Sequence, residues 1–189
     1  MGMLYEVELK FRIEPSRAIE DELQENGAVE VVVVSHVDRY FNHPSRDFRS
    51  TDEAFRIRSI GEGNCVTYKG PVQGTVAKTR REIEVEFANG EEAAHQIFLM
   101  VQLLGFRFVR EVRKTRRSYT LSKNQFDYVL AVDEVPRLGR FLEIEVLAEK
   151  DRREAAEAAV WEFAHFLNLT VAEPRSYLDM LLESDGSLK

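Results

Sequence analysis

Features that mark several common protein classes are missing from this sequence. Its one cysteine, Cys65, excludes an internal disulfide framework. The N-terminus lacks the continuous apolar segment of a secretory signal or a membrane span. With 26 Lys and Arg against 33 Asp and Glu, the net charge of −7 argues against general nucleic-acid binding through the phosphate backbone. These absences predict a cytoplasmic protein that binds neither membranes nor nucleic acid.

Sequence motifs for phosphate loops, hydrolase nucleophiles and zinc sites are also missing. There is no GxxxxGK[ST] loop, no GxGxxG after a strand and no GxSxG elbow. Cys65 lies in an apolar run, which is typical of a packed thiol. Any bound phosphate must therefore be held by side chains. The histidines have no metal-ligand spacing and are interpreted as surface or packing residues: His36, His43, His95 and His165.

The chain is long enough and apolar enough for one substantial core. Its 189 residues are 44% hydrophobic, which suits a single compact domain over residues 1–189 better than two domains. Aromatic and β-branched residues are plentiful, so the 31% of charged residues is not a signature of disorder. The charges must therefore have a place within the folded domain.

Hydrophobic periodicity predicts about eight strands and two or three principal helices, which is an α+β fold. We expect the strands to close into an antiparallel β-barrel with helices packed on its outside, because closure leaves no strand edge exposed. Period-two alternation between turn residues predicts strands over 5–13, 29–41, 54–60, 65–69, 79–87, 106–121, 126–135 and 141–147. Helical spacing predicts helices over 16–26, 91–104 and 152–167, and a short one over 176–182.

Charged residues recur at two-residue spacing along these strands, so each set lies on one face of its strand. Alternating strands commonly turn such residues to solvent, and one strand alone would decide nothing. The helices need an apolar surface to cover, however, which would leave the charged faces turned into the barrel. The sets are Glu6, Glu8 and Lys10; Arg56 and Arg58; Arg80, Glu82, Glu84 and Glu86; Lys114 and Arg116; and Glu143 and Glu145, with Lys69 and Asp133 as single charges.

An interior that contains both signs of charge indicates two kinds of ligand. Buried charges must be paired or bind ions, so clustered carboxylates indicate a metal, and clustered Arg and Lys indicate a multiply charged anion. We therefore expect a triphosphate bound together with Mg²⁺ or Mn²⁺. These hard cations prefer carboxylate oxygens, which are offered by Glu6, Glu8, Glu143 and Glu145.

An ordered series of motifs along nearly the whole chain resembles the CYTH superfamily, the triphosphate tunnel metalloenzymes. The ExExK hallmark of that family reads Glu6-Val7-Glu8-Leu9-Lys10 here. The segments HPSRDFRSTDEAFRIR and SYLDML are most similar to the class IV adenylyl cyclases and their archaeal relatives. The other matching motifs are DRYF at 38–41, TYKGP at 67–71, TRREIEVEF at 79–87, VRKTRRSY, VDEVPRLGRFLEIE and PRSYLDML at 174–181.

The resemblance implies a role for each charged set. Asp133 would assist at the metal or the substrate, and Glu82 and Glu84 would orient neighbouring basic side chains. The phosphates would be bound by Lys10, Arg56, Arg58, Lys69, Arg80, Lys114 and Arg116, and the metal by Glu6, Glu8, Glu143 and Glu145. The residues expected to act in catalysis are Glu8, Lys10, Lys69 and Asp133.

Three functions are consistent with such a site. A cyclase would convert ATP to cyclic AMP and pyrophosphate, which is the activity of the branch that the chain resembles most. A triphosphatase would release orthophosphate from tripolyphosphate, thiamine triphosphate or a nucleotide, with Tyr40 and Lys69 as a pair that activates water. A module without turnover would only bind nucleotide or polyphosphate, but anion binding alone would not favour so many carboxylates.

Aromatic residues near the C-terminus bear on self-association. Trp161, Phe163 and Phe166 fit either the core or the surface of a homodimer, and their helical spacing favours the core.

Overall fold

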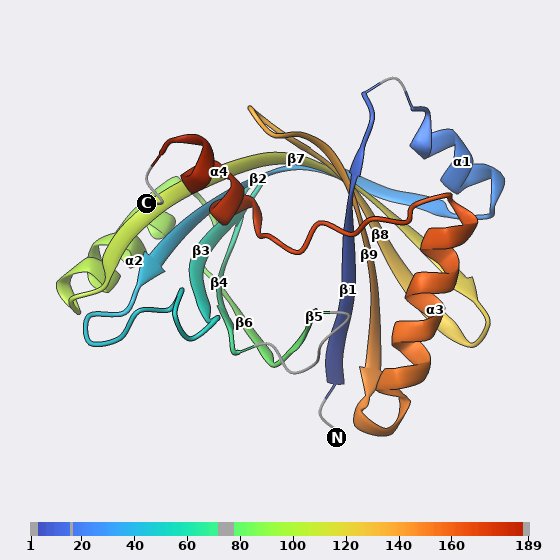
Figure 1. The fold of residues 1–189 in the computed structure, drawn as a ribbon. Helices are drawn as coiled ribbons and strands as arrows, with labels where there is room; N and C mark the ends of the chain where they lie inside the picture. The colour runs from blue at the N-terminus through green and yellow to red at the C-terminus, as the bar shows by residue number, and fades with distance from the viewer. Residues whose placement is uncertain (1–3, 16, 72–77, 187–189) are drawn as a thin grey trace. The chain divides into compact units, whose positions relative to one another are not determined.

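The computed structural model of the protein describes residues 4–15, 17–71 and 78–186 (Figure 1). Contacts between these residues divide the chain into two compact units. The first unit contains the described residues within 1–33, 73–79 and 115–189, and the second contains those within 34–72 and 80–114. A single domain over 1–189 stays a prediction.

The described residues form strands and helices close to the predicted positions, and the α+β fold class is confirmed. The strands are β1 (Leu4–Ile13), β2 (Val29–Asn42), β3 (Ala54–Ile60), β4 (Gly63–Lys69), β5 (Lys78–Arg80), β6 (Glu82–Phe87), β7 (Arg107–Lys123), β8 (Phe126–Val135) and β9 (Gly139–Glu149). The α-helices are α1 (Ile19–Glu25), α2 (Glu91–Leu103), α3 (Arg153–Phe166) and α4 (Tyr177–Ser184), with a 3₁₀ turn at Lys150–Arg152.

The strands form one sheet with the order β5-β1-β9-β8-β7-β2-β3-β4-β6, in which the described ladders are antiparallel. The predicted closure into a barrel is wrong, because this order has two ends, β5 and β6, and no ladder joins them within the described residues. The predicted strand over 79–87 is also divided at Arg81, where the chain leaves the side of β1 and joins β4. A single residue between β5 and β6 cannot make a hairpin, which needs a turn of at least two residues.

The first unit buries the apolar face of its strands against a helix. Val7 lies opposite Val146, and Leu9 lies opposite Ile144, in the ladder between β1 and β9. Helix α3 runs alongside these two strands (Figure 1) and adds Phe163 to the same core. Burial of each such side chain contributes roughly 1.5–3 kcal/mol to the free energy of unfolding, so this core fixes the register of β1.

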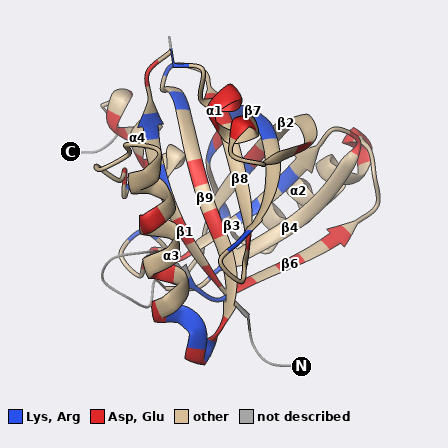
Figure 2. Cartoon of the chain, turned by 90° about the vertical axis from the view of Figure 1, so that its right-hand side faces the viewer, with Lys and Arg blue, Asp and Glu red and all other residues tan. Residues whose placement is uncertain are grey.

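The charged residues of the same strands lie on the opposite face, because successive side chains of a strand alternate between faces. In the ladder, Glu8 lies opposite Glu145, and Lys10 lies opposite Glu143. Figure 2 shows charged bands along β1 and β9. The helix therefore covers the apolar face and leaves the charged face turned away from it, as the sequence predicts.

The second unit divides its strands in the same way. Phe41 and Ile57 form a small core with Val101 of α2. On the other face of β2 and β3, Asp38 lies opposite Arg58. In both units, therefore, the alternation in the sequence puts apolar residues on the face that packs against a helix and charged residues on the opposite face.

Local signals in the sequence mark the ends of several helices. Gly27 and Gly105 follow α1 and α2 with φ of +89° and +90°, which suits the predicted stops. At the start of α4, the Asp179 amide donates to Ser176 Oγ at 3.0 Å, and the Ser176 amide donates to the Asp179 carboxylate at 3.2 Å. This capping box fixes Tyr177 as the first residue of α4.

The aromatic residues of α3 are divided between core and surface. Phe163 is buried and Trp161 packs against the same core, whereas Phe166 is exposed. The predicted core position is therefore confirmed for the first two residues. No helix in the described parts of the chain is long and apolar enough to cross a membrane.

Candidate functional site

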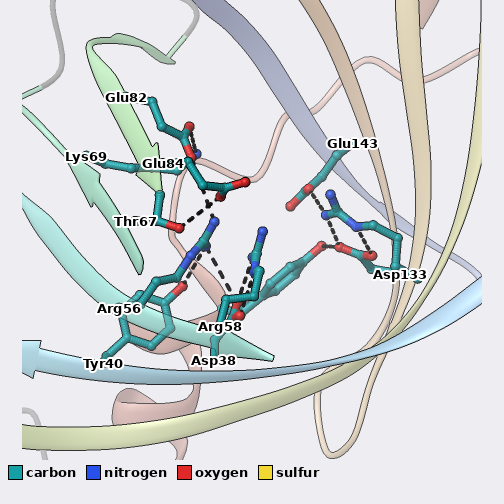
Figure 3. Close-up of polar contacts among 12 residues, drawn as sticks. Asp38, Tyr40, Arg56, Arg58, Thr67, Lys69, Glu82, Glu84, Asp133 and Glu143 are labelled. Carbon is teal, nitrogen blue, oxygen red and sulfur yellow. Dashed lines mark hydrogen bonds and ion pairs between the residues drawn. The ribbon is translucent and has the colours of Figure 1, made fainter. Parts of the chain in front are cut away.

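A buried cluster of ion pairs lies on the polar face of the second unit (Figure 3). Arg58 donates two hydrogen bonds to Asp38, from Nε to Oδ1 at 2.6 Å and from Nη2 to Oδ2 at 2.8 Å. Arg56 lies 3.6 Å from the same carboxylate and donates to the hydroxyl of Tyr40 at 3.2 Å. The ladder between β2 and β3 creates this cluster, because it places Asp38 opposite Arg58 and Tyr40 opposite Arg56.

Neighbouring positive charges keep Asp38 ionised although its side chain is buried. Burial alone would raise the pKa of Asp38, but Arg56, Arg58 and Lys114 outweigh burial and hold this pKa well below its usual range. Burial would likewise lower the pKa of Arg56, but Asp38 and Tyr40 raise this pKa well above its usual value. Three cations therefore act on one buried carboxylate.

A second set of contacts extends from this cluster onto β4 and β6. The ammonium of Lys69 lies 2.7 Å from the carboxylate of Glu82, which lies 4.0 Å from Arg56. Thr67 donates a hydrogen bond to Glu84 at 2.9 Å. Figure 3 shows Lys69 directed toward Glu82. Glu82 thus lies beside two basic side chains, whereas Glu84 accepts a hydrogen bond from Thr67; that both carboxylates orient basic side chains stays a prediction.

Three other predicted residues have distinct surroundings in the second unit. Lys114 is buried on β7, and Arg80 is half-buried at the end of β5. Cys65 is buried, as predicted, but it lies on the polar face opposite Arg58. Burial raises the pKa of the Cys65 thiol, with a further contribution from Glu84, so the uncharged thiol is favoured.

The first unit holds its own cluster of charged residues. Arg116 donates to both oxygens of Asp133, from Nε to Oδ1 at 2.7 Å and from Nη2 to Oδ2 at 2.6 Å, and it also contacts Glu143. Tyr177 donates its hydroxyl to Asp133 Oδ2 at 2.9 Å. Asp133 is 0% exposed, and burial together with Glu143 and Asp133 raises the pKa of Tyr177 well above its usual value. Tyr177 therefore stays protonated and acts as a donor.

Carboxylates of the first unit are the candidate ligands for a hard divalent cation. Glu8 and Glu145 are direct partners across β1 and β9, and side chains in such positions have Cβ atoms about 4.5–5.5 Å apart. Glu6 lies two residues from Glu8 on the same face, opposite Leu147. The described residues contain no group of three or more Asp, Glu, His or Cys that could hold a metal ion. Two carboxylates suit Mg²⁺, which is usually bound by one or two of them together with substrate phosphates.

Two residues of these clusters were not among the predicted site residues. Asp38 belongs to the DRYF motif, and Tyr177 belongs to SYLDML, but neither motif says which side chain it contacts. Asp38 shares a face with Tyr40 by alternation, which was an available signal. Tyr177 lies far along the chain from Asp133, so their contact follows only from the folded chain.

Comparisons with known proteins agree with these features. The sequence model of the CYTH domain matches residues 4–177. A protein of Methanocaldococcus jannaschii named "Putative adenylate cyclase" is 34% identical over 180 residues, which cover 94% of this chain and 98% of that protein. The solved structure of the PH1819 protein from Pyrococcus horikoshii has a TM-score of 0.83 and 38% identity, covering 95% of this chain and 99% of that one.

A more distant structure shows the fold alone. HpAC1 from Hippeastrum, described as a putative adenylyl cyclase with a dominant triphosphatase activity, has a TM-score of 0.68 and 17% identity, covering 99% of this chain and 98% of that one. The CYTH match over residues 4–177 and the 34% identity over nearly the whole length show that this chain belongs to the CYTH domain family.

Proposed function

We propose that this protein is a metal-dependent enzyme that acts on a triphosphate. The observation that carries the proposal is the group of Arg56, Arg58 and Lys114, whose three positive charges act on the single buried carboxylate of Asp38. Positive charge clustered at a buried position favours an anion of high charge, although Asp38 and Glu82 offset part of it here. A triphosphate supplies that charge, and membership of the CYTH family supports this class of ligand.

The site residues divide into two chemical tasks. Glu8 and Glu145 would hold Mg²⁺ or Mn²⁺ on the first unit, with Glu6 and Glu143 beside them, and the cation would supply Lewis-acid activation of a hydroxyl group and neutralisation of phosphate charge. The proposed phosphate contacts are Arg56, Arg58, Lys69, Arg80 and Lys114 on the second unit, and Lys10 and Arg116 on the first.

The reaction that we propose first is the conversion of ATP to cyclic AMP and pyrophosphate. The 3′-hydroxyl of the ribose attacks the α-phosphorus in line with the bond to the leaving pyrophosphate. Arg56 and Arg58 stabilise the negative charge that develops on the leaving group, because their positions are already fixed by Asp38 and Tyr40. The name of the M. jannaschii relative, 34% identical to this chain, supports this activity.

The second candidate is the hydrolysis of a triphosphate to orthophosphate. The described activity of HpAC1 supports it, because a protein of the same fold has a dominant triphosphatase activity. In this reaction water attacks the terminal phosphorus, and the same basic residues bind the remaining phosphates. Tyr40 accepts a hydrogen bond from Arg56 and Lys69 contacts Glu82, and the pairing of Tyr40 with Lys69 stays a prediction.

Product analysis tests the proposal directly. Purified protein is incubated with Mg²⁺ or Mn²⁺ and one of three substrates, ATP, tripolyphosphate or thiamine triphosphate, and cyclic AMP, pyrophosphate and orthophosphate are separated. Cyclic AMP with an equal amount of pyrophosphate identifies the cyclase. Orthophosphate without cyclic AMP identifies the triphosphatase, and with tripolyphosphate as substrate an equal amount of pyrophosphate accompanies it. Binding of tripolyphosphate without any product refutes both reactions and leaves a binding module.

Variants connect the product to the site. Glu8→Gln and Lys10→Ala are expected to abolish turnover, because they remove a metal ligand and a phosphate contact. The control is Glu30→Gln, which removes an exposed ion pair with Arg117 at 2.8 Å, and it is expected to retain full activity. Equal loss in all three variants would show that the loss is not specific to the proposed site residues.

A further inference from the structure

The segment between α3 and α4 contacts β1 beside the ExExK motif. Ala172 forms an isolated antiparallel bridge with Phe11, and the amide of Glu173 donates to the carbonyl of Lys10 at 2.7 Å. Figure 1 shows this segment crossing β1 before it enters α4. Its position is therefore fixed by the backbone at Lys10 and Phe11.

The same segment holds the ammonium group of Lys10. Lys10 Nζ donates to the carbonyl of Arg175 at 2.5 Å and lies 4.4 Å from the centre of the Tyr177 ring. The side chain is 5% exposed, so this long flexible group has few positions open to it. A carbonyl acceptor uses one of the three N–H donors of a lysine. The ammonium therefore keeps donors for a phosphate while its position is set.

Tyr177 also contacts the second cation of this cluster through Asp133. Its hydroxyl donates to Asp133, which accepts two hydrogen bonds from Arg116. Arg116 in turn contacts Glu143, the partner of Lys10 across β1 and β9. Five side chains are thus linked by a series of contacts that runs from Lys10 through Tyr177, Asp133 and Arg116 to Glu143, with two cations and two carboxylates. Tyr177 is the uncharged member of this series.

We propose that Tyr177 is a positioning residue, whose ring places the ammonium of Lys10 and whose hydroxyl fixes Asp133 and, through it, Arg116. The inference rests on the proposed function, since Lys10 and Arg116 are the phosphate contacts that it positions. Asp133 then acts on Arg116 rather than on the metal, because its two oxygens accept three hydrogen bonds from protein groups. The C-terminal helix is accordingly part of the site.

Two substitutions separate the two contacts of Tyr177. Tyr177→Phe removes the hydroxyl and keeps the ring, and we expect kcat/KM for the triphosphate to fall about 10-fold, as for the loss of a hydrogen bond to a charged group. Tyr177→Leu removes both contacts, and we expect a fall of about 100-fold, because a misplaced catalytic contact costs that much. In Tyr177→Leu, the larger part of the loss appears as a higher KM, since Lys10 binds phosphate.

A matched control is available on the other face of the same sheet. Tyr128 is also buried, and its hydroxyl donates to the carbonyl of Ala159 at 3.3 Å. Tyr128→Phe also loses a buried hydrogen bond, here to an uncharged acceptor, and this bond involves neither Lys10 nor Asp133, so kcat/KM should stay within about twofold. An equal loss in Tyr177→Phe and Tyr128→Phe would overturn the proposal, because a general effect on packing would explain both.

A second measurement is independent of any enzymatic activity. The rate at which an acylating reagent modifies Lys10 is followed by peptide mass spectrometry in the absence of substrate. Tyr177→Leu is expected to raise this rate several-fold, and Tyr177→Phe to leave it unchanged, because only the leucine removes the ring. An unchanged rate in Tyr177→Leu would refute the positioning of Lys10. If the wild-type protein neither binds nor converts any triphosphate, the proposed function fails, while the labelling rate still decides the inference about Lys10.

Discussion

Removal of the negative charge of Asp38 should destabilise the protein strongly. Asp38→Asn keeps the shape of the side chain but leaves Arg58 and Arg56 without the carboxylate that they contact at 2.6 Å and 3.6 Å. Breaking a buried ion pair from one side costs about 3–5 kcal/mol, since the remaining charge stays buried. For a chain of this length, each kcal/mol lowers Tm by roughly 2–4 °C, so the expected fall is about 6–20 °C.

Thermal unfolding followed by circular dichroism measures this loss, and tripolyphosphate gives the assay a second arm. If the cluster binds phosphates, the anion replaces part of the missing charge, and its addition should raise the Tm of Asp38→Asn more than that of the wild type. A ligand at 100 times its Kd stabilises the folded state by about 2.7 kcal/mol. A large fall in the Tm of Asp38→Asn, together with a larger recovery on addition of tripolyphosphate, would indicate excess positive charge at this cluster.

The exposed pair of Glu30 and Arg117 supplies the comparison. Glu30→Gln should change stability by at most about 1 kcal/mol, as is usual for exposed ion pairs. If Asp38→Asn lowers Tm no more than Glu30→Gln, the carboxylate of Asp38 does not offset buried charge. If tripolyphosphate stabilises wild type and Asp38→Asn equally, the anion does not bind beside Arg56 and Arg58, and the reasoning about phosphate binding is refuted.

Three further predictions concern pH, helix capping and metal. Burial would raise the pKa of Glu53, but hydrogen bonds from Thr51, Tyr68 and Arg46 outweigh burial and lower this pKa to about 2. The ionised Glu53 therefore stabilises the folded state above the unfolded pKa of about 4.3, and this stabilisation is lost as pH falls toward 2. Urea midpoints between pH 5 and pH 2 should therefore fall less in Glu53→Gln than in wild type, and parallel curves would contradict this. Ser176→Ala should lower the free energy of unfolding by about 1 kcal/mol, measured by urea, because the α4 capping box is lost, and an unchanged midpoint would show that the cap adds nothing. Chelation with EDTA should reduce product formation to background, with recovery on addition of Mg²⁺ or Mn²⁺, whereas full activity in EDTA would exclude the proposed metal.

Much of the fold follows from the sequence because its strands alternate strictly and end at strong turn signals. The predicted bounds of β3 and β8 agree with the structure, since Gly61 and Pro136 mark their ends. The closed barrel was wrong because the alternation of residues does not indicate which strands pair. Alternation predicts the face on which each residue lies, whereas closure depends on pairing between the edge strands. At Arg81 the chain passes from one edge strand, β5, to the other, β6.

The charged faces could likewise be predicted, but their individual contacts could not. Arg56 and Arg58 share a face by period two, yet their pairing with Asp38 depends on the register between β2 and β3. Tyr177 contacts Asp133 across 44 residues of chain, and no local pattern indicates such a contact. The sequence therefore predicts which residues share a face and leaves the partner of each side chain to the folded structure.

The strict division of β1 between apolar and charged faces restricts how this segment can change during evolution. Deletion of one residue within ExExK would exchange the two faces for the residues on one side of the deletion, so the charged residues of the motif and the apolar Val7 and Leu9 would no longer lie on opposite faces. Substitutions that keep the chemical class of a residue preserve both faces, whereas insertions and deletions of odd length destroy the core and the charged face together. Natural variants of this protein should therefore differ in residue identity along β1 but share its length between Glu6 and Ile13.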